Sequence, residues 1–151
     1  MERWAVTVEQ MTQVDRIMTE EIGIDLLQMM ENAGRHVAAK ARTILRADVA
    51  GKHILVLAGS GNNGGGGLAA ARHLANWGAD VRVLLAKAAE RLAGVPRKQA
   101  SILHRMGIAS AVWKPDLQSA HIWPQTNLIL DALVGYGLKG APREPVASLI
   151  R

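Results

Sequence analysis

A run of glycines between a short apolar segment and a run of small residues constrains this chain more than any other feature of its sequence. Residues 53–59 read HILVLAG, an apolar segment without alternation, which is typical of a strand buried on both faces of a sheet. Six glycines follow within residues 59–67, interrupted by one serine and two asparagines. Helical spacing begins at residue 66 and runs to Gly78, a suitable residue for the end of a helix. A strand, a glycine-rich loop and a helix in this order predict one unit of an α/β fold.

The alternation of strands and helices continues along the chain. Two amphipathic helices come first, each opened by a capping box, Thr7 with Gln10 and Asp25 with Gln28. Later segments alternate in the same way, with strands expected at 80–86, 110–114 and 126–133 and helices at 95–107 and 143–151. We therefore expect one domain over 1–151, an α/β fold with a doubly wound, mostly parallel sheet, helices on both faces and two N-terminal helices before it.

Composition narrows the classes of protein further. The 151 residues are 49% hydrophobic and contain no cysteine and no phenylalanine, so we expect an aliphatic core and no disulfide or thiolate metal site. No apolar run approaches the roughly 20 residues that cross a bilayer, and the N-terminus is charged, which predicts a cytoplasmic protein without a membrane partner. The net charge of +5 comes from scattered basic residues, which argues against a nucleic-acid surface.

The glycine-rich loop matches the Gly-x-Gly-x-x-Gly spacing of dinucleotide-binding folds from Gly59 to Gly64. Such folds usually hold the ribose with an acidic residue at the end of the second strand, whereas this strand ends in Lys87. An ordinary NAD site is therefore disfavoured, and a phosphate-loop ATPase is excluded because no Gly-Lys-Ser/Thr follows the glycines. Asn62 and Asn63 leave two interpretations open: their side chains stabilise a turn, or an amide oxygen contacts a ligand.

A second group of residues is expected beside the glycine-rich loop. Asp131 ends a predicted buried strand, and a glycine-bearing loop follows it. Because ligands of open α/β sheets bind outside the carboxyl ends of the strands, both loops should meet in one crevice. A carboxylate among apolar residues needs a hydrogen-bond donor or a cation, so Asp131 is either a structural residue or, as we favour, a functional one. Lys139 and Arg143 lie where they could neutralise phosphate.

Three blocks of sequence, in this order and spacing, resemble one known family. They are MTQVDRIMTEEIGIDLLQMMENAGRHVA, VLAGSGNNGGGGLAAARHLANWGADVRVLL and LILDALVGYGLKGAPREPVASLI. They resemble the NAD(P)H-hydrate epimerase family, also called the YjeF N-terminal domain. The resemblance implies a Rossmann-like, three-layer α/β/α domain, usually a homodimer, that interconverts the R and S epimers of NADHX and NADPHX. These are hydrated forms of NADH and NADPH, so the implied role is isomerase activity in nicotinamide nucleotide repair.

The resemblance also implies roles for particular residues. Two segments would contact the substrate, Asn62, Asn63, Gly64, Gly65 and Gly66 in the first, and Gly135, Tyr136, Gly137, Leu138, Lys139, Gly140 and Ala141 in the second. Asn63 and Asp131 would bind a potassium ion, for which amide and carboxylate oxygens are suitable hard ligands. The catalytic acid/base stays unassigned.

Two departures from the family pattern bear on activity. The family's loop usually reads Asn-Asn-Gly-Gly-Asp-Gly, whereas this chain has Gly66 where the acid is expected. The family also continues with a strand ending in Asp-x-Pro-Ser-Gly, which supplies an acid/base candidate and a further potassium ligand, and nothing in these 151 residues matches it. We therefore expect a C-terminally truncated sheet without its distal strands, an incomplete potassium site and weak or absent epimerase activity.

Two other functions remain as alternatives. One is a non-catalytic module on the same fold, which binds a nucleotide or dimerises as a scaffold, and the weaker one is an RNA-binding domain that uses the positive charge. A sheet that lacks its distal strands would expose an edge strand and an apolar face. We therefore expect a homodimer or a higher homo-oligomer.

Overall fold

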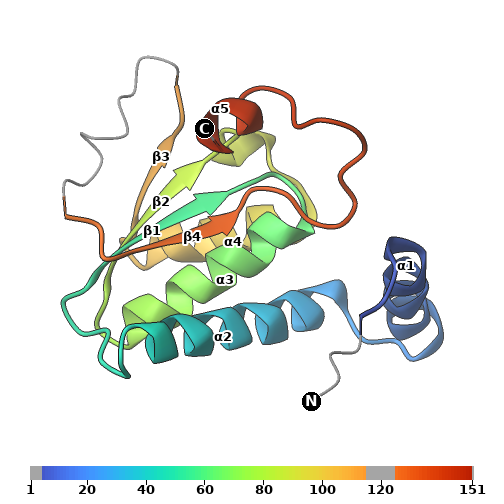
Figure 1. Cartoon of the computed structure of the whole chain (residues 1–151), viewed down its shortest axis with the longest axis horizontal. Helices are drawn as coiled ribbons and strands as arrows, with labels where there is room; N and C mark the ends of the chain where they lie inside the picture. The colour runs from blue at the N-terminus through green and yellow to red at the C-terminus, as the bar shows by residue number, and fades with distance from the viewer. Residues whose placement is uncertain (1–4, 115–124, 151) are drawn as a thin grey trace.

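The computed structural model describes residues 5–114 and 125–150, and the connector expected after residue 114 lies outside them. Figure 1 shows the elements, which follow in the order α1 (Val8–Arg16), the π-helical turn η1 (Ile17–Glu21), α2 (Leu26–Ile44), β1 (His53–Ala58), α3 (Asn62–Asn76), β2 (Asp80–Leu85), the 3-10 turn η2 (Ala89–Arg91), α4 (Gly94–Arg105), β3 (Ala109–Val112), β4 (Leu128–Ala132) and α5 (Val146–Ile150). The predicted strands and helices are all present, although several boundaries shift.

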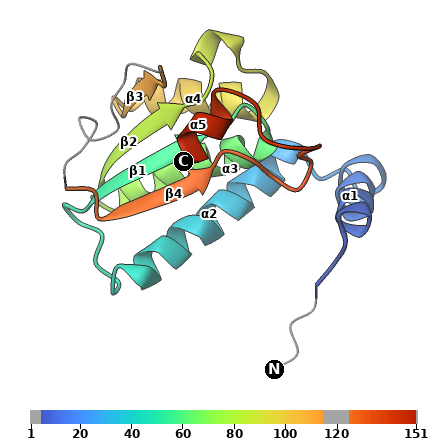
Figure 2. The same ribbon diagram turned by 45° about the horizontal axis from the view of Figure 1, so that its top comes forward.

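The four described strands form one parallel sheet in the order β3-β2-β1-β4. Helices α2, α3 and α4 cover one face, and α5 lies on the other (Figure 1, Figure 2). The predicted Rossmann-like α/β class is therefore confirmed, with a sheet that is wholly parallel among the described strands. The chain crosses from β3 at one side to β4 at the other, so β1 and β4 lie next to each other where the strand order reverses.

Both predicted capping boxes are present and explain where the N-terminal helices begin. The backbone N–H of Gln10 donates to Thr7 Oγ1 at 3.2 Å, and the backbone N–H of Thr7 donates to the side-chain oxygen Oε1 of Gln10 at 2.8 Å. At the start of α2, the Asp25 N–H donates to Gln28 Oε1 at 2.9 Å. These reciprocal bonds satisfy N–H groups that the first helical turn leaves without partners.

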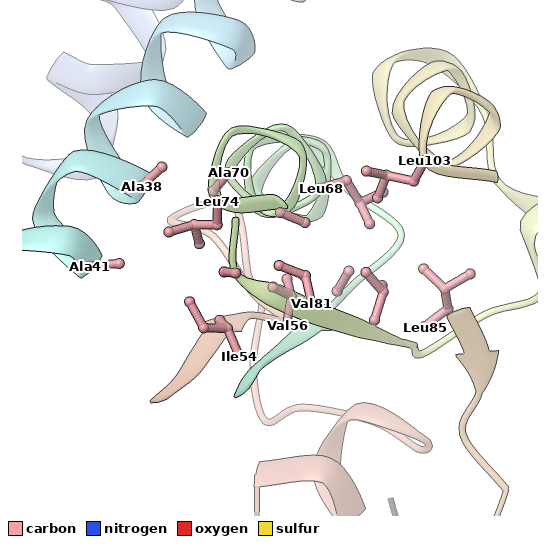
Figure 3. Packing of buried hydrophobic residues seen from close by; sticks show 14 of the residues in the cluster. Ala38, Ala41, Ile54, Val56, Leu68, Ala70, Leu74, Val81, Leu85 and Leu103 are labelled. Carbon is pink, nitrogen blue, oxygen red and sulfur yellow. The ribbon is translucent and has the colours of Figure 1, made fainter. Parts of the chain in front are cut away.

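The core is aliphatic, as the composition predicted. Its buried cluster consists only of alanine, valine, leucine and isoleucine side chains, and it fills the space between the sheet and helices α2, α3 and α4 (Figure 3). Ile54 and Val56 of β1 point at Leu68 and Leu74 of α3, and all four are fully buried. Helix α3 therefore forms the central contact between the sheet and the two outer helices.

The contact between α2 and α3 depends on small residues. A Cβ on Gly34 would lie 2.5 Å from Ala69 Cβ and 2.7 Å from the Gly66 carbonyl oxygen, so only glycine fits there. The buried residues of α2 are Gly34, Ala38 and Ala41. This helix is amphipathic as predicted, but its buried face is narrow, since its apolar residues Leu27, Val37 and Ile44 are exposed.

One polar cluster joins α2 to α3 beside this contact. The Glu31 carboxylate accepts hydrogen bonds from Arg72 Nη2 and, at 2.7 Å, from His73 Nε2. Partial burial raises the pKa of the Glu31 carboxyl, but hydrogen bonds from Arg72 and His73 and their positive charges outweigh it and hold that pKa below its usual value of 4.5. The ionised carboxylate therefore stabilises the folded state.

This cluster predicts a pH-dependent contribution to stability. Because the pKa of Glu31 is lowered in the folded state, its stabilisation is present above the unfolded pKa and is lost as pH falls through the folded pKa. Urea unfolding between pH 7 and pH 3 should show Glu31→Gln less stable than the parent at pH 7, with a gap that closes toward low pH. Glu90→Gln, at an exposed glutamate of η2, is the control. A gap that stays constant with pH would contradict this assignment.

Candidate functional site

The glycine run belongs to a helix rather than to the loop that we predicted. Helix α3 begins at Asn62, so the four consecutive glycines, Gly64 to Gly67, form its first turns. Glycine is a poor helix former, but close contacts require it at two of these positions. A Cβ on Gly64 would lie 2.0 Å from the Gly59 carbonyl oxygen, and a Cβ on Gly67 would lie 2.3 Å from Ala132 Cβ. The run therefore lets α3 lie directly against β1 and β4.

Gly66 differs from the glycines around it. A Cβ on Gly65 would lie 2.9 Å from Val95 Cγ1, whereas the nearest atom to a Cβ on Gly66 would be Met30 Sδ at 3.8 Å, an ordinary contact distance. Packing therefore does not require glycine at position 66. Gly66 lines a cavity, so a side chain there would border that cavity.

The two predicted segments meet at the carboxyl ends of β1 and β4, in the crevice that the topology indicated. The Gly59 N–H donates to the Ala132 carbonyl at 3.1 Å, and Asn63 Nδ2 donates to the Val134 carbonyl at 2.9 Å. A Cβ on Gly135 would lie 3.2 Å from Asn63 Cβ. The first turn of α3 is therefore fixed against the loop that follows β4.

A cavity of about 560 Å³ opens between α2, β4 and this junction, and we call it the first cavity. Its apolar wall comes from α2, and its polar wall from the start of α3 and the loop after β4. The lining residues that matter below are Asp15, Asn62, Asn63, Gly66, Asp131, Gly135, Tyr136 and Gly137. Six of the predicted substrate residues therefore border one cavity, and the predicted potassium ligands border the same one.

Asp131 is exposed, and β4 is not the buried strand that we predicted. Among the described strands β4 pairs only with β1, so it forms an edge of the sheet, and Ile129 is exposed on it as well. Asp131 Oδ1 accepts a hydrogen bond from the Leu133 N–H at 2.9 Å. That is the structural bond we considered for Asp131, and it leaves the second carboxylate oxygen available to a ligand.

The oxygens present suit part of a potassium site. Asn63 uses its amide nitrogen to donate to Val134, which leaves its amide oxygen as an acceptor, and Asp131 adds a carboxylate oxygen at the same cavity. Alkali cations prefer such oxygen ligands. No group of three or more histidine, aspartate or glutamate side chains in residues 5–114 and 125–150 could hold a metal ion, so backbone or other oxygens would have to complete the set.

A contact between α1 and the loop after β4 lies at the first cavity, which both of its residues line. Tyr136 donates its phenolic hydrogen to the Asp15 carboxylate. That hydrogen bond, together with burial and the carboxylate charge, raises the pKa of Tyr136. Periodicity could not have predicted this pair, because the residues lie 121 positions apart.

A second cavity of about 630 Å³ lies on the other side of the same junction, over the carboxyl ends of β1, β2 and β3. Three more residues of the predicted substrate loop line it, Leu138, Lys139 and Ala141. Gly140 is exposed in the same loop with φ of +73°, whereas Gly64 and Gly65 are buried inside α3. Lys87, Arg91 and Arg143 also line this cavity. Arg91 was not predicted as a site residue from the sequence. Its position soon after Lys87, beyond the end of β2, was a signal that could have indicated it.

The fold and this edge of the sheet define a Rossmann-like α/β domain with a glycine-rich helix start at the point where the strand order reverses. The chain matches the family described as YjeF-related protein N-terminus over residues 26–151, and it therefore belongs to this family. In the described part of the chain, no helix has the length and apolar character to span a bilayer.

Individual relatives agree with the family. The chain is 42% identical over 149 residues to the NAD(P)H-hydrate epimerase of Dehalogenimonas lykanthroporepellens, covering 97% of this chain and 57% of that protein. It is 37% identical over 150 residues to the bifunctional NAD(P)H-hydrate repair enzyme Nnr of Moorella thermoacetica, covering 97% and 28%. The crystal structure of yeast ynu0, YNL200c, aligns with a TM-score of 0.85 at 31% identity, covering 98% of this chain and 63% of that one. The chain thus spans little more than half of its epimerase relative.

The two neighbouring glycines of α3 give a matched test of this packing. Gly66→Ala should raise the free energy of unfolding by up to about 1 kcal/mol, because alanine favours a helix and position 66 has room. Gly67→Ala should lower it by about 1–3 kcal/mol, because its Cβ would overlap Ala132. Urea denaturation of both variants measures the difference. Equal effects of the two substitutions would show that α3 does not lie this close to β4.

Proposed function

We propose that this chain forms the nucleotide-binding part of a protein that interconverts the R and S epimers of hydrated NADH and NADPH. Membership of the family and the names of the relatives support the substrate class. The observation that carries the proposal is the junction of Asn63 with Val134 and Gly135, which brings both segments of the family resemblance to one cavity. We also propose a cytoplasmic location, as expected for an enzyme of nucleotide repair.

The start of α3 is suited to the pyrophosphate of such a substrate. The first N–H groups of a helix have no intrahelical partners and carry the positive end of the helix dipole, so they attract phosphate. Asn62 and Asn63 occupy the first two positions of α3 and are exposed. Their amides would bind the substrate, and the loop from Gly135 to Ala141 would contact it from the opposite side.

Potassium fits this arrangement as an auxiliary ion. Asn63 and Asp131 would hold it, and its charge would screen the pyrophosphate from the Asp131 carboxylate. This use of Asp131 explains why a carboxylate stands at a phosphate-binding edge, where its own charge would otherwise repel the ligand.

Epimerisation at a hydroxyl-bearing carbon needs a proton donor and acceptor close to that carbon. The family resemblance gives this role to an aspartate in a segment that residues 1–151 do not contain. We therefore propose that this stretch of chain binds the substrate and converts it weakly or not at all. Purified chain added to (R)-NADHX should leave the epimer ratio nearly unchanged over the time in which a complete epimerase equilibrates it, and fast conversion would contradict that proposal.

Substrate binding can be tested by thermal stabilisation with ADP-ribose or NADHX in potassium and in sodium buffers. A ligand at about 100 times its Kd should stabilise the fold by about 2.7 kcal/mol. Asp131→Asn should remove the potassium-dependent part of this gain. Asp48→Asn is the matched control, because Asp48 Oδ1 accepts from the N–H two residues later, as Asp131 does. Absence of any ligand shift in either salt would favour the alternative of a non-catalytic scaffold.

We further propose that the chain associates with a second copy through the apolar surface of α2 and the edge of β4. Ile129 on β4 is 56% exposed, and on α2 Ile44 is 58% and Val37 43% exposed. Ile129 and Val37 also border the first cavity, so this surface adjoins the proposed substrate site. Exposed edge strands and large apolar patches favour association. Light scattering should therefore give the mass of a dimer or a higher oligomer, and Ile129→Lys should shift the protein toward monomer. A parent chain that is monomeric at every concentration would contradict the proposal.

A further inference from the structure

The second cavity collects positive charge that is dispersed in the sequence. Lys87 and Arg91 reach it from the segment after β2, and Lys139 and Arg143 reach it from the loop after β4. Among the described residues that line it, Glu144 is the single acidic one, and its Oε2 accepts a hydrogen bond from Ser148 Oγ at 2.6 Å. The lining therefore carries a clear excess of positive charge around about 630 Å³.

The four basic side chains are not neutralised by the protein. Within residues 5–114 and 125–150, none of them forms an ion pair. All four are exposed residues that line this one cavity. Like charges held around one hollow repel one another, and a bound anion relieves this repulsion. The chemistry of the cavity therefore favours a phosphate group.

The location of the cavity indicates which phosphate. Ser60 lines the second cavity and Gly61 the first; Val134 lines the second and Gly135 the first. The two cavities are therefore separated by the junction of α3 with the loop after β4, and a dinucleotide whose pyrophosphate sits at the α3 N-terminus would extend into both. The β2 side of such a fold receives the adenosine ribose, where an acidic residue binds a free 2′-hydroxyl and a basic residue accommodates a 2′-phosphate.

We propose that the second cavity is a subsite for the 2′-phosphate of an adenosine ribose, so that the chain prefers 2′-phosphorylated dinucleotides such as NADPHX over NADHX. Lys87 and Arg91 determine this preference, because they follow the strand whose end faces the ribose in this class of fold. Lys139 and Arg143 complete the charge from the opposite wall. The inference rests on the proposed dinucleotide substrate, but the subsite can be tested without it.

Two nucleotides with the same number of phosphates provide that test. Calorimetric titration at one fixed ionic strength should show adenosine 2′,5′-bisphosphate binding at least about ten-fold tighter than adenosine 5′-diphosphate. The double variant Lys87→Met with Arg91→Met should lose this ratio. Lys98→Met with Arg105→Met is the control, because it removes the same two charges from exposed positions of α4 that are not among the lining residues of this cavity.

The outcomes separate the subsite from the proposed function. Equal affinity of the parent chain for the two nucleotides, or failure of both to bind, would overturn the subsite. The subsite would also be overturned if Lys98→Met with Arg105→Met abolished the preference for adenosine 2′,5′-bisphosphate as fully as Lys87→Met with Arg91→Met does. Binding of ADP-ribose without any 2′-phosphate preference would leave the proposed function standing and remove the subsite. A preference for adenosine 2′,5′-bisphosphate in a chain that binds neither ADP-ribose nor NADHX would support the subsite and count against the proposed function.

Discussion

The arrangement of this domain depends on how closely α3 approaches β1 and β4. Gly64 lies against the backbone of Gly59, and Gly67 lies against Ala132, at distances that leave no room for a Cβ. This approach brings Asn63 to the loop after β4, where its side chain donates to Val134. A larger residue at either glycine would move the helix away from the strands and separate the two halves of the site. The glycine run is therefore explained by packing at positions 64 and 67, and not by flexibility.

Charge divides the edge of the sheet into two unlike parts. The first cavity holds Asp15 and Asp131, amide groups and an apolar wall from α2, which suits a neutral ring and a cation. The second cavity holds four basic residues and suits phosphate. The start of α3 lies between them and offers N–H groups. An elongated ligand with an anionic end and an uncharged ring end matches this order of cavity, helix start and cavity. A compact ligand would not reach both cavities.

Much of the fold could be predicted because its signals are local. Capping boxes at Thr7 and Asp25, the buried run of β1 and the spacing of α4 depend on neighbours within a few residues. The start of α3 was misplaced because helix propensity argues against four glycines, and only contacts with Gly59 and Ala132, distant in sequence, reverse that preference. The exposure of Asp131 depends on which strands flank β4, and the grouping of Lys87 with Arg143 depends on how two loops fold back. No pattern within one segment of the sequence predicts the exposure of Asp131 or the grouping of Lys87 with Arg143.

In the proposed complex, one dinucleotide spans both cavities with its pyrophosphate at the start of α3. A crystal structure of the chain with NADPHX or ADP-ribose 2′-phosphate in potassium tests this arrangement. We expect the pyrophosphate within hydrogen-bonding distance of the first amides of α3, the nicotinamide-side ribose in the first cavity and the 2′-phosphate beside Lys87 and Arg91. A ligand bound away from the α3 N-terminus, or confined to one cavity with its 2′-phosphate in solvent, would contradict it.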